Sequence, residues 1–116
     1  MCVGLIAILR LPKFASQATL VELTMKTFKI LLRKEINRVN MSKRDVAVIM
    51  QALRQHSGRA AVVREGANAI LNMCYEKANV VFVVENGGVE LLLAGVAAGN
   101  PPSVQASCAG ALQSVS

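Results

Sequence analysis

The sequence has 116 residues, enough for one small domain with a single modest hydrophobic core. Hydrophobic residues make up 53% of it and aromatic residues only 3%, so Ala, Val and Leu must fill the interior. That composition favours closely packed helices over a β-sheet, and it excludes a disordered chain. The net charge of +6 is unevenly placed, because seven of the thirteen cations fall in the stretch 26–44.

This basic stretch contains a single acid, Glu35, among its cations, while the rest of the chain is close to neutral. A concentrated positive charge attracts acidic proteins, nucleic acid or anionic lipid, but it is equally typical of the solvated face of a helix. The seven cations are Lys26, Lys29, Arg33, Lys34, Arg38, Lys43 and Arg44.

The N-terminal run MCVGLIAILRLP is apolar, which raises the question of a signal peptide. No cation precedes the run and Arg10 interrupts it, so we expect a buried helix and no membrane segment. The three cysteines, Cys2, Cys74 and Cys108, have no CxxC spacing and apolar neighbours. They indicate reduced, buried thiols in a cytoplasmic or nuclear protein rather than a disulfide framework or a zinc site.

Short apolar helices are expected around 4–11, 46–53 and 89–96, and each ends near a Pro or Gly breaker. After each breaker the pattern predicts a longer amphipathic helix, over about 17–34, 59–75 and from Ser103 onward. Ser103 follows two prolines and is a candidate N-cap.

These units repeat at an interval of 42 residues. The segment 66–74 matches 108–116 in its order of small, polar and apolar residues, which pairs Asn72 with Ser114 and, one interval earlier, with Ile30. This interval lies in the range of helical solenoids, in which each unit covers its apolar face by stacking on its neighbours.

The segment 79–93 resembles the first helix, the Gly-Gly corner (Gly87-Gly88) and the second helix of armadillo repeats, and 104–116 resembles the third helix. The resemblance implies an all-α, right-handed solenoid of about two and a half repeats: 1–36 (second and third helices), 37–78 (complete) and 79–116 (ending early). Arg44-Asp45 stands where the next unit has Gly-Gly, so we expect a differently built junction there. The resemblance also implies a longer array, or self-association through uncovered ends.

Armadillo proteins bind extended peptides along their third helices, so the resemblance implies a protein-interaction scaffold. In the nuclear-import adaptors of this family, a ladder of Asn and Trp side chains binds the peptide. Here only Asn72 is kept of that ladder, and the Trp positions hold Lys26, Asn68 and Gly110. A reader of basic import signals is therefore not expected. Cations at helical spacing beside Asn68 and Asn72 suit an acidic or phosphorylated peptide instead. The candidate partner-binding residues are Lys26, Lys29, Ile30, Arg33, Glu65, Asn68, Asn72 and Ser114.

Two other interpretations are weaker. Nucleic acid could bind the stretch 26–44, but with one Tyr and no Trp only phosphate contacts are available, so we do not expect it. Catalysis is not expected, because His56 is the only histidine and neither a nucleophile–base pair nor a phosphate loop can be identified. No cofactor is predicted. For Asn72 itself, a bond to a neighbouring helix is as plausible as contact with a ligand.

Overall fold

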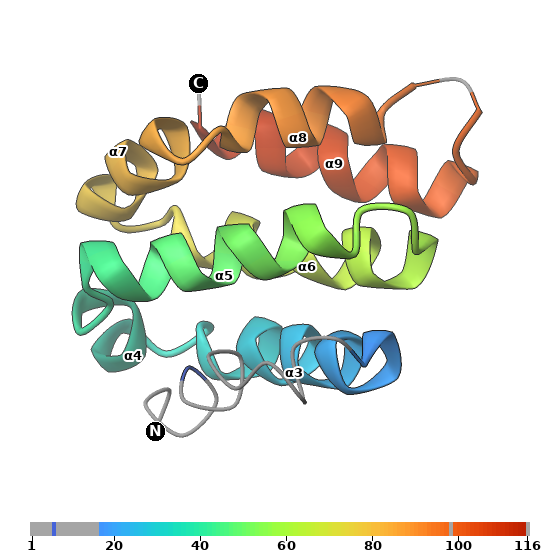
Figure 1. Cartoon of the computed structure of the whole chain (residues 1–116). Coiled ribbons are helices and arrows are strands. Elements are labelled where there is room, and N and C mark those ends of the chain that lie inside the picture. The colour runs from blue at the N-terminus through green and yellow to red at the C-terminus, as the bar shows by residue number, and fades with distance from the viewer. Residues whose placement is uncertain (1–5, 7–16, 98, 116) are drawn as a thin grey trace.

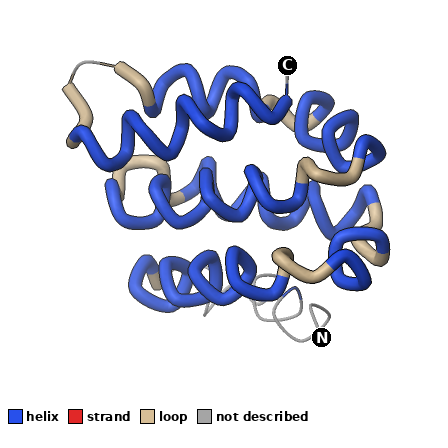
Figure 2. The backbone as a smooth tube through the Cα atoms, turned by 180° about the vertical axis from the view of Figure 1, so that it is seen from behind, coloured by secondary structure: helices blue, strands red, loops and turns tan. Residues whose placement is uncertain are grey.

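The computed structural model describes Ile6, 17–97 and 99–115, and within these residues α-helices joined by short turns are the regular secondary structure. No strand occurs in this part of the chain (Figure 2). The helix expected over 4–11 lies outside the described residues, except for Ile6, which is buried. The helices are α3 (Ala18–Leu31), α4 (Glu35–Val39), α5 (Lys43–Gln55), α6 (Ala60–Met73), α7 (Lys77–Glu85), α8 (Gly88–Gly95) and α9 (Pro102–Val115).

The helices lie in three layers (Figure 1). The layer at one side holds α3, the middle one holds α5 and α6, and the third holds α8 and α9. Helices α4 and α7 both lie at the left edge of the view, on either side of the start of α5. The most extensive contacts join α3 to α6 and α6 to α9, and α8 packs on α9. Helix α6 is therefore covered on both sides by the other two long helices.

The boundaries of the helices recur at regular intervals. Helices α3, α6 and α9 each have 14 residues and begin at Ala18, Ala60 and Pro102, which are 42 residues apart. Helices α4 and α7 begin at Glu35 and Lys77, again 42 apart.

The corners that follow α3 and α6 are also built alike. The Asn37 side chain donates through Nδ2 to the Leu31 carbonyl at 2.8 Å, and Asn79 donates to the Met73 carbonyl at 3.0 Å. Asn79 also donates to the Arg38 carbonyl at 3.0 Å, which joins α7 to the end of α4. These amides satisfy carbonyls at helix ends that have no partner within the helix.

The junction between α7 and α8 depends on glycine. The two helices meet at 80°, and Gly87 between them has φ 76°, a left-handed conformation that costs glycine little. A side chain on Gly88 would place its Cβ 2.8 Å from the Val83 carbonyl oxygen. A glycine corner was expected at Gly87-Gly88, and the structure has one there.

The corresponding junction before α5 is built differently, as expected. Ser42 caps α5 by accepting a hydrogen bond from the Asp45 N–H, and the Asp45 carboxylate accepts one from the Ser42 N–H. Arg44 and Asp45 lie inside the helix rather than at its corner. The prediction for Ser103 is wrong: α9 begins at Pro102, so Ser103 lies in its first turn. Proline suits the first helical position, where its missing N–H would have no partner in any case.

Among the described residues, the buried core contains Met, Leu, Ile, Val, Ala and Cys side chains and one aromatic ring, that of Phe28, which is fully buried. Glycine lets some helices approach closely: a Cβ on Gly66 would overlap the Leu53 side chain, and one on Gly95 would overlap Cys108. Cys74 and Cys108 are buried free thiols. Burial raises the pKa of Cys74 to about 11, although a hydrogen bond with Ser114 acts in the opposite direction, and burial also raises the pKa of Cys108. The dominant cause is the loss of water around the charged form of the thiol.

No single helix in the described ranges is both long and apolar enough to cross a membrane; α7 and α8 reach that length and composition only together, across their 80° bend.

Candidate functional site

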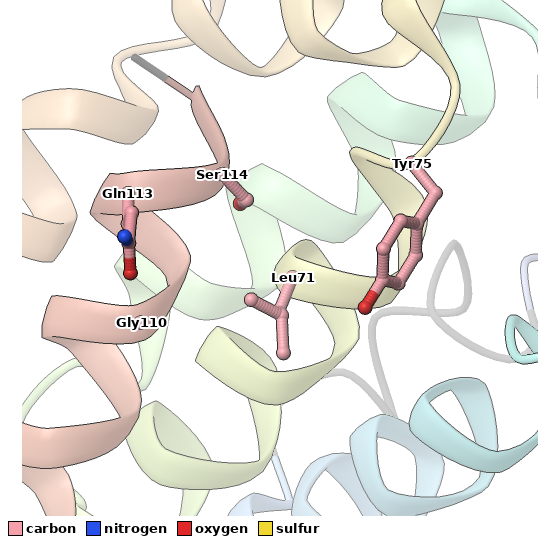
Figure 3. Close-up of a pocket in the computed structure, with 5 residues that line it drawn as sticks. All are labelled: Leu71, Tyr75, Gly110, Gln113 and Ser114. Atoms are coloured by element: carbon pink, nitrogen blue, oxygen red, sulfur yellow. The ribbon is translucent and has the colours of Figure 1, made fainter.

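Two shallow depressions lie on the surface formed by α3, α6 and α9. The first, the α3/α6 depression, has a volume of about 250 Å³ and is lined by Lys29, Arg33, Asn68, Leu71 and Asn72. The second, the α6/α9 depression, has a volume of about 220 Å³ and is lined by Leu71, Tyr75, Gly110, Gln113 and Ser114 (Figure 3). Leu71 lines both, so the two depressions adjoin.

The α3/α6 depression therefore brings together four of the eight candidate residues, and Ser114 lies in the other depression. Asn68 and Asn72 are four residues apart in α6, so helical geometry places them on one face. Arg33 lies in the turn just after α3, not in the helix expected over 17–34, and still lines the depression beside Lys29. Lys26 is exposed and Ile30 is 50% exposed, but neither lines a depression.

Lys29 and Glu65 form an ion pair between α3 and α6. Lys29 Nζ lies 2.6 Å from Glu65 Oε2, and Arg64 Nε lies 3.6 Å from Glu65 Oε1. The side chains of Lys29 and Glu65 are only 20% and 10% exposed, so the pair is shielded from water. Most of the positive charge of Lys29 is thus neutralised within the protein, and Glu65 acts between the helices rather than on the open surface.

Asn72 also joins these two helices. Its Nδ2 donates to the Lys29 carbonyl at 2.7 Å, close to the C-terminal end of α3. Ser114, its partner in the 42-residue register, instead donates to the Ala111 carbonyl of its own helix at 2.6 Å. The matched positions Asn72 and Ser114 therefore make different contacts, one between helices and one within a helix.

Arg33 and Asn68 keep their polar groups available. In the described part of the chain, no hydrogen bond or ion pair involves the Arg33 guanidinium or the Asn68 amide. Both line the α3/α6 depression, so an anion or a peptide backbone can reach them there.

Arg38 and Tyr75 were missed by sequence reasoning. Arg38 Nη1 donates to the Leu32 and Arg33 carbonyls at 3.1 and 2.8 Å, beyond the end of α3. Its guanidinium also lies over the Tyr75 ring, 5.4 Å from the centroid. Leu71 and Gln113 were missed as well. The sequence contained little signal for them. Leu71 and Gln113 each directly precede a candidate residue, Asn72 or Ser114, and Tyr75 is the sole tyrosine.

The basic stretch 26–44 is less uniform in space than in sequence. Lys29 pairs with Glu65, Lys43 with Glu85 at 3.1 Å, and Arg38 binds carbonyls. The charged groups of the other four cations make no ion pair or hydrogen bond within the described ranges. These cations are Lys26, Arg33, Lys34 and Arg44.

Groups with metal-binding or redox chemistry do not gather in this part of the molecule. Among the described residues, no three His, Cys, Asp or Glu side chains lie close enough to hold a metal ion. The raised pKa values of Cys74 and Cys108 keep both thiols protonated at neutral pH, which makes them poor nucleophiles. The surface along α3, α6 and α9 presents a guanidinium, amides and an apolar side chain, those of Arg33, Asn68, Asn72 and Leu71.

Comparison with known proteins gives no match among family models, curated sequences or solved structures. The resemblance to armadillo repeats thus depends on the motifs of this chain alone. What it implies about the arrangement of the helices and about function is a proposal.

Proposed function

We propose that this chain is an armadillo-type α-solenoid segment and acts as a protein-interaction scaffold that binds an extended acidic peptide along α3, α6 and α9. The 42-residue spacing of the helix boundaries supports the solenoid, as do the two asparagine corners and the left-handed Gly87. The packing of α3 on α6 and of α6 on α9 is what stacked repeats require.

The observation that carries the proposal is the pair of adjoining depressions across these helices, which share Leu71. A surface lined by three parallel elements suits an elongated ligand better than a compact one. Rigid helices hold the lining side chains in place, so a bound peptide loses entropy while the protein loses little.

The charge of the surface selects the ligand. Lys29 is already paired with Glu65, so Arg33 is the cation of the α3/α6 depression with its charge still available. Guanidinium binds carboxylates and phosphates in a two-pronged geometry. The Asn68 side-chain amide and the side-chain oxygen of Asn72 make no hydrogen bond within the described residues. Both can therefore bind the peptide backbone beside Arg33.

A charge reversal at Arg33 tests the proposal, with Arg44→Glu as the matched control. Both residues are exposed cations of the same stretch, but Arg44 lies at the start of α5, away from both depressions. Binding is measured by fluorescence anisotropy with a labelled, end-blocked decapeptide of alternating Glu and Ser. We expect Arg33→Glu to weaken binding about tenfold or more, and Arg44→Glu to weaken it by less than about twofold.

Equal losses in the two variants would contradict a groove at Arg33. Nucleic acid is the second candidate, because the four unpaired cations of 26–44 could contact phosphates without a defined groove. It predicts equal losses in both variants, measured with a thymidine homopolymer, together with a steep fall in affinity between low and physiological salt. Circular dichroism of each variant checks that the helices are intact.

A further inference from the structure

We infer that the α6/α9 depression is a side-chain pocket that receives an apolar residue of the bound peptide, close to the acidic residue bound at Arg33. This rests on the proposed function, because it specifies the peptide that the surface selects. The pocket is lined by Leu71, Tyr75, Gly110, Gln113 and Ser114, none of which is charged (Figure 3).

The hollow exists because α9 has a glycine, Gly110, where it faces this space. A Cβ built on Gly110 would meet no atom within 4 Å, so the space above this residue is open. In the 42-residue register, the equivalent positions of α3 and α6 hold Lys26 and Asn68, which carry long or polar side chains. Only the α9 position leaves room for a side chain from outside.

The walls of the hollow suit an apolar group. Leu71 and the Tyr75 ring face it from α6 and from the residues just beyond α6, while Gly110 and Ser114 face it from α9 (Figure 3). The Ser114 hydroxyl already donates to the Ala111 carbonyl at 2.6 Å, so its proton is not offered to a ligand. Transfer of an aliphatic side chain from water to such a surface is favourable because it buries apolar area on both partners.

The Tyr75 ring is held in position although it is exposed. Tyr75 as a whole is 69% exposed, yet Arg38 lies over its ring at 5.4 Å and is itself bound to the Leu32 and Arg33 carbonyls. One wall of the pocket is therefore fixed before a ligand arrives, which reduces the entropy lost on binding.

The neighbouring charge identifies the occupant. Because Leu71 lines both depressions, an apolar side chain in one lies beside an anionic side chain at Arg33 in the other. Packed helices are about 10 Å apart, which an extended peptide spans in about three residues. The structure therefore fits a peptide with an acidic residue and a Leu, Ile or Met two to four positions from it.

A leucine scan tests this pocket. The probes are labelled decapeptides that contain Glu and Ser only, and a series in which a single Leu replaces each Ser in turn. We expect Leu at one position, two to four residues from a Glu, to raise the affinity about fivefold. Gly110→Leu should fill the hollow, so that a Leu in the peptide no longer raises the affinity above that of the Glu-Ser peptide measured with the same variant.

Gly58→Leu is the matched control. Gly58 also has no atom within 4 Å of a built Cβ and is exposed, but it lies between α5 and α6, outside both depressions. The control variant should keep the leucine gain. A gain that persists in Gly110→Leu, or no gain at any position with the wild-type chain, would overturn the pocket.

A second probe separates the pocket from the proposed function. N-acetyl-leucinamide, which has no charge, is titrated at millimolar concentration while the amide signals of Gly110 and Ser114 are followed by NMR. Shifts at these amides that disappear in Gly110→Leu support the pocket even if no acidic peptide binds, in which case only the proposed function fails. Acidic-peptide binding without such shifts overturns the pocket alone. If the Gly110 and Ser114 amide signals shift with protein concentration and not with the added probe, a second copy of the chain occupies this surface. That result would also overturn the pocket.

Discussion

The two sides of α6 are packed by different means. On the side of α3, a shielded ion pair between Lys29 and Glu65 and a hydrogen bond from Asn72 to the Lys29 carbonyl join the helices. On the side of α9, no charged residue is available, because that helix reads PSVQASCAGALQSV. Its contacts come from small buried residues, namely Val104, Cys108 and Ala111.

The difference shows two ways of joining equivalent helices. The ion pair must offset the loss of water around two charges, so it adds little net stability but penalises any arrangement that separates its partners. Close packing of small side chains adds stability through many weak contacts and tolerates no added volume. We expect the α3 side to be sensitive to the removal of a charge and the α9 side to be sensitive to the addition of a methyl group.

The largest expected effect comes from adding a methyl group to the C-terminal layer. Gly95→Ala places a Cβ against Cys108 Sγ, so α8 and α9 must move apart, and the free energy of unfolding should fall by about 2 kcal/mol. Gly110→Ala is the control in α9, where the Cβ meets no atom within 4 Å. It should raise the free energy of unfolding by up to about 1 kcal/mol, since Ala favours helix. Urea denaturation measures both, and equal changes would show that the C-terminal layer is not tightly packed.

An effect of similar or slightly smaller size is expected from removing a charge on the α3 side. Glu65→Gln leaves Lys29 shielded and without its partner carboxylate, so we expect a loss of about 1.5 to 2 kcal/mol. The control is Glu85→Gln, which breaks the exposed Lys43–Glu85 pair, whose side chains are 67% and 47% accessible. That variant should lose less than about 0.5 kcal/mol. Urea denaturation at matched salt compares them, and losses of equal size would mean that the Lys29–Glu65 pair is effectively solvated.

The smallest expected effect is a pH dependence of the free energy of unfolding that arises from the buried Cys74 thiol, which is hydrogen-bonded to Ser114. Its pKa is about 11 in the folded chain against an ordinary 9.0, so the unfolded chain releases this proton first as the pH rises. Keeping the Cys74 thiol protonated in the folded chain costs nothing below pH 9. Between about pH 9 and pH 11 this preference lowers the free energy of unfolding, because only the unfolded chain can release the proton. At pH 10 the loss should be about 1 kcal/mol relative to pH 8. Urea denaturation of wild type and Cys74→Ala at the two pH values isolates it, and parallel changes in both proteins would contradict it.

Much of the helical structure could be predicted from local signals in the chain. Apolar periodicity and Pro or Gly breakers predicted a helix over 59–75, and α6 spans Ala60–Met73. The Gly87-Gly88 pair predicted a sharp junction because only glycine adopts its conformation at low cost. Ser103 was predicted to be the N-cap of the last helix, but α9 already begins at Pro102. Both residues suit a helix N-terminus, and nothing in the local sequence decides between them.

The candidate site could be predicted only in part. The helical spacing of Asn68 with Asn72 was sufficient to group these two on one face of α6. Arg33 was grouped with Lys29 on the assumption that the helix continues to 34, whereas α3 ends at Leu31. Which charges stay available was not predictable, because the pairing of Lys29 with Glu65 depends on how α3 and α6 are aligned. The contact of Arg38 with Tyr75 joins residues that are distant in sequence, and the open space over Gly110 depends on what its neighbours leave unfilled.

The asparagine corners after α3 and α6 have a consequence for the order of folding. Asn37 and Asn79 each bind a carbonyl only six residues earlier, whereas Lys29 and Glu65, or Asn72 and the Lys29 carbonyl, are some forty residues apart. Closing a short loop costs less chain entropy than closing a long one. The bonds from Asn37 to Leu31 and from Asn79 to Met73 can therefore form without contact between the long helices, although Asn79 makes a second bond to the distant Arg38 carbonyl.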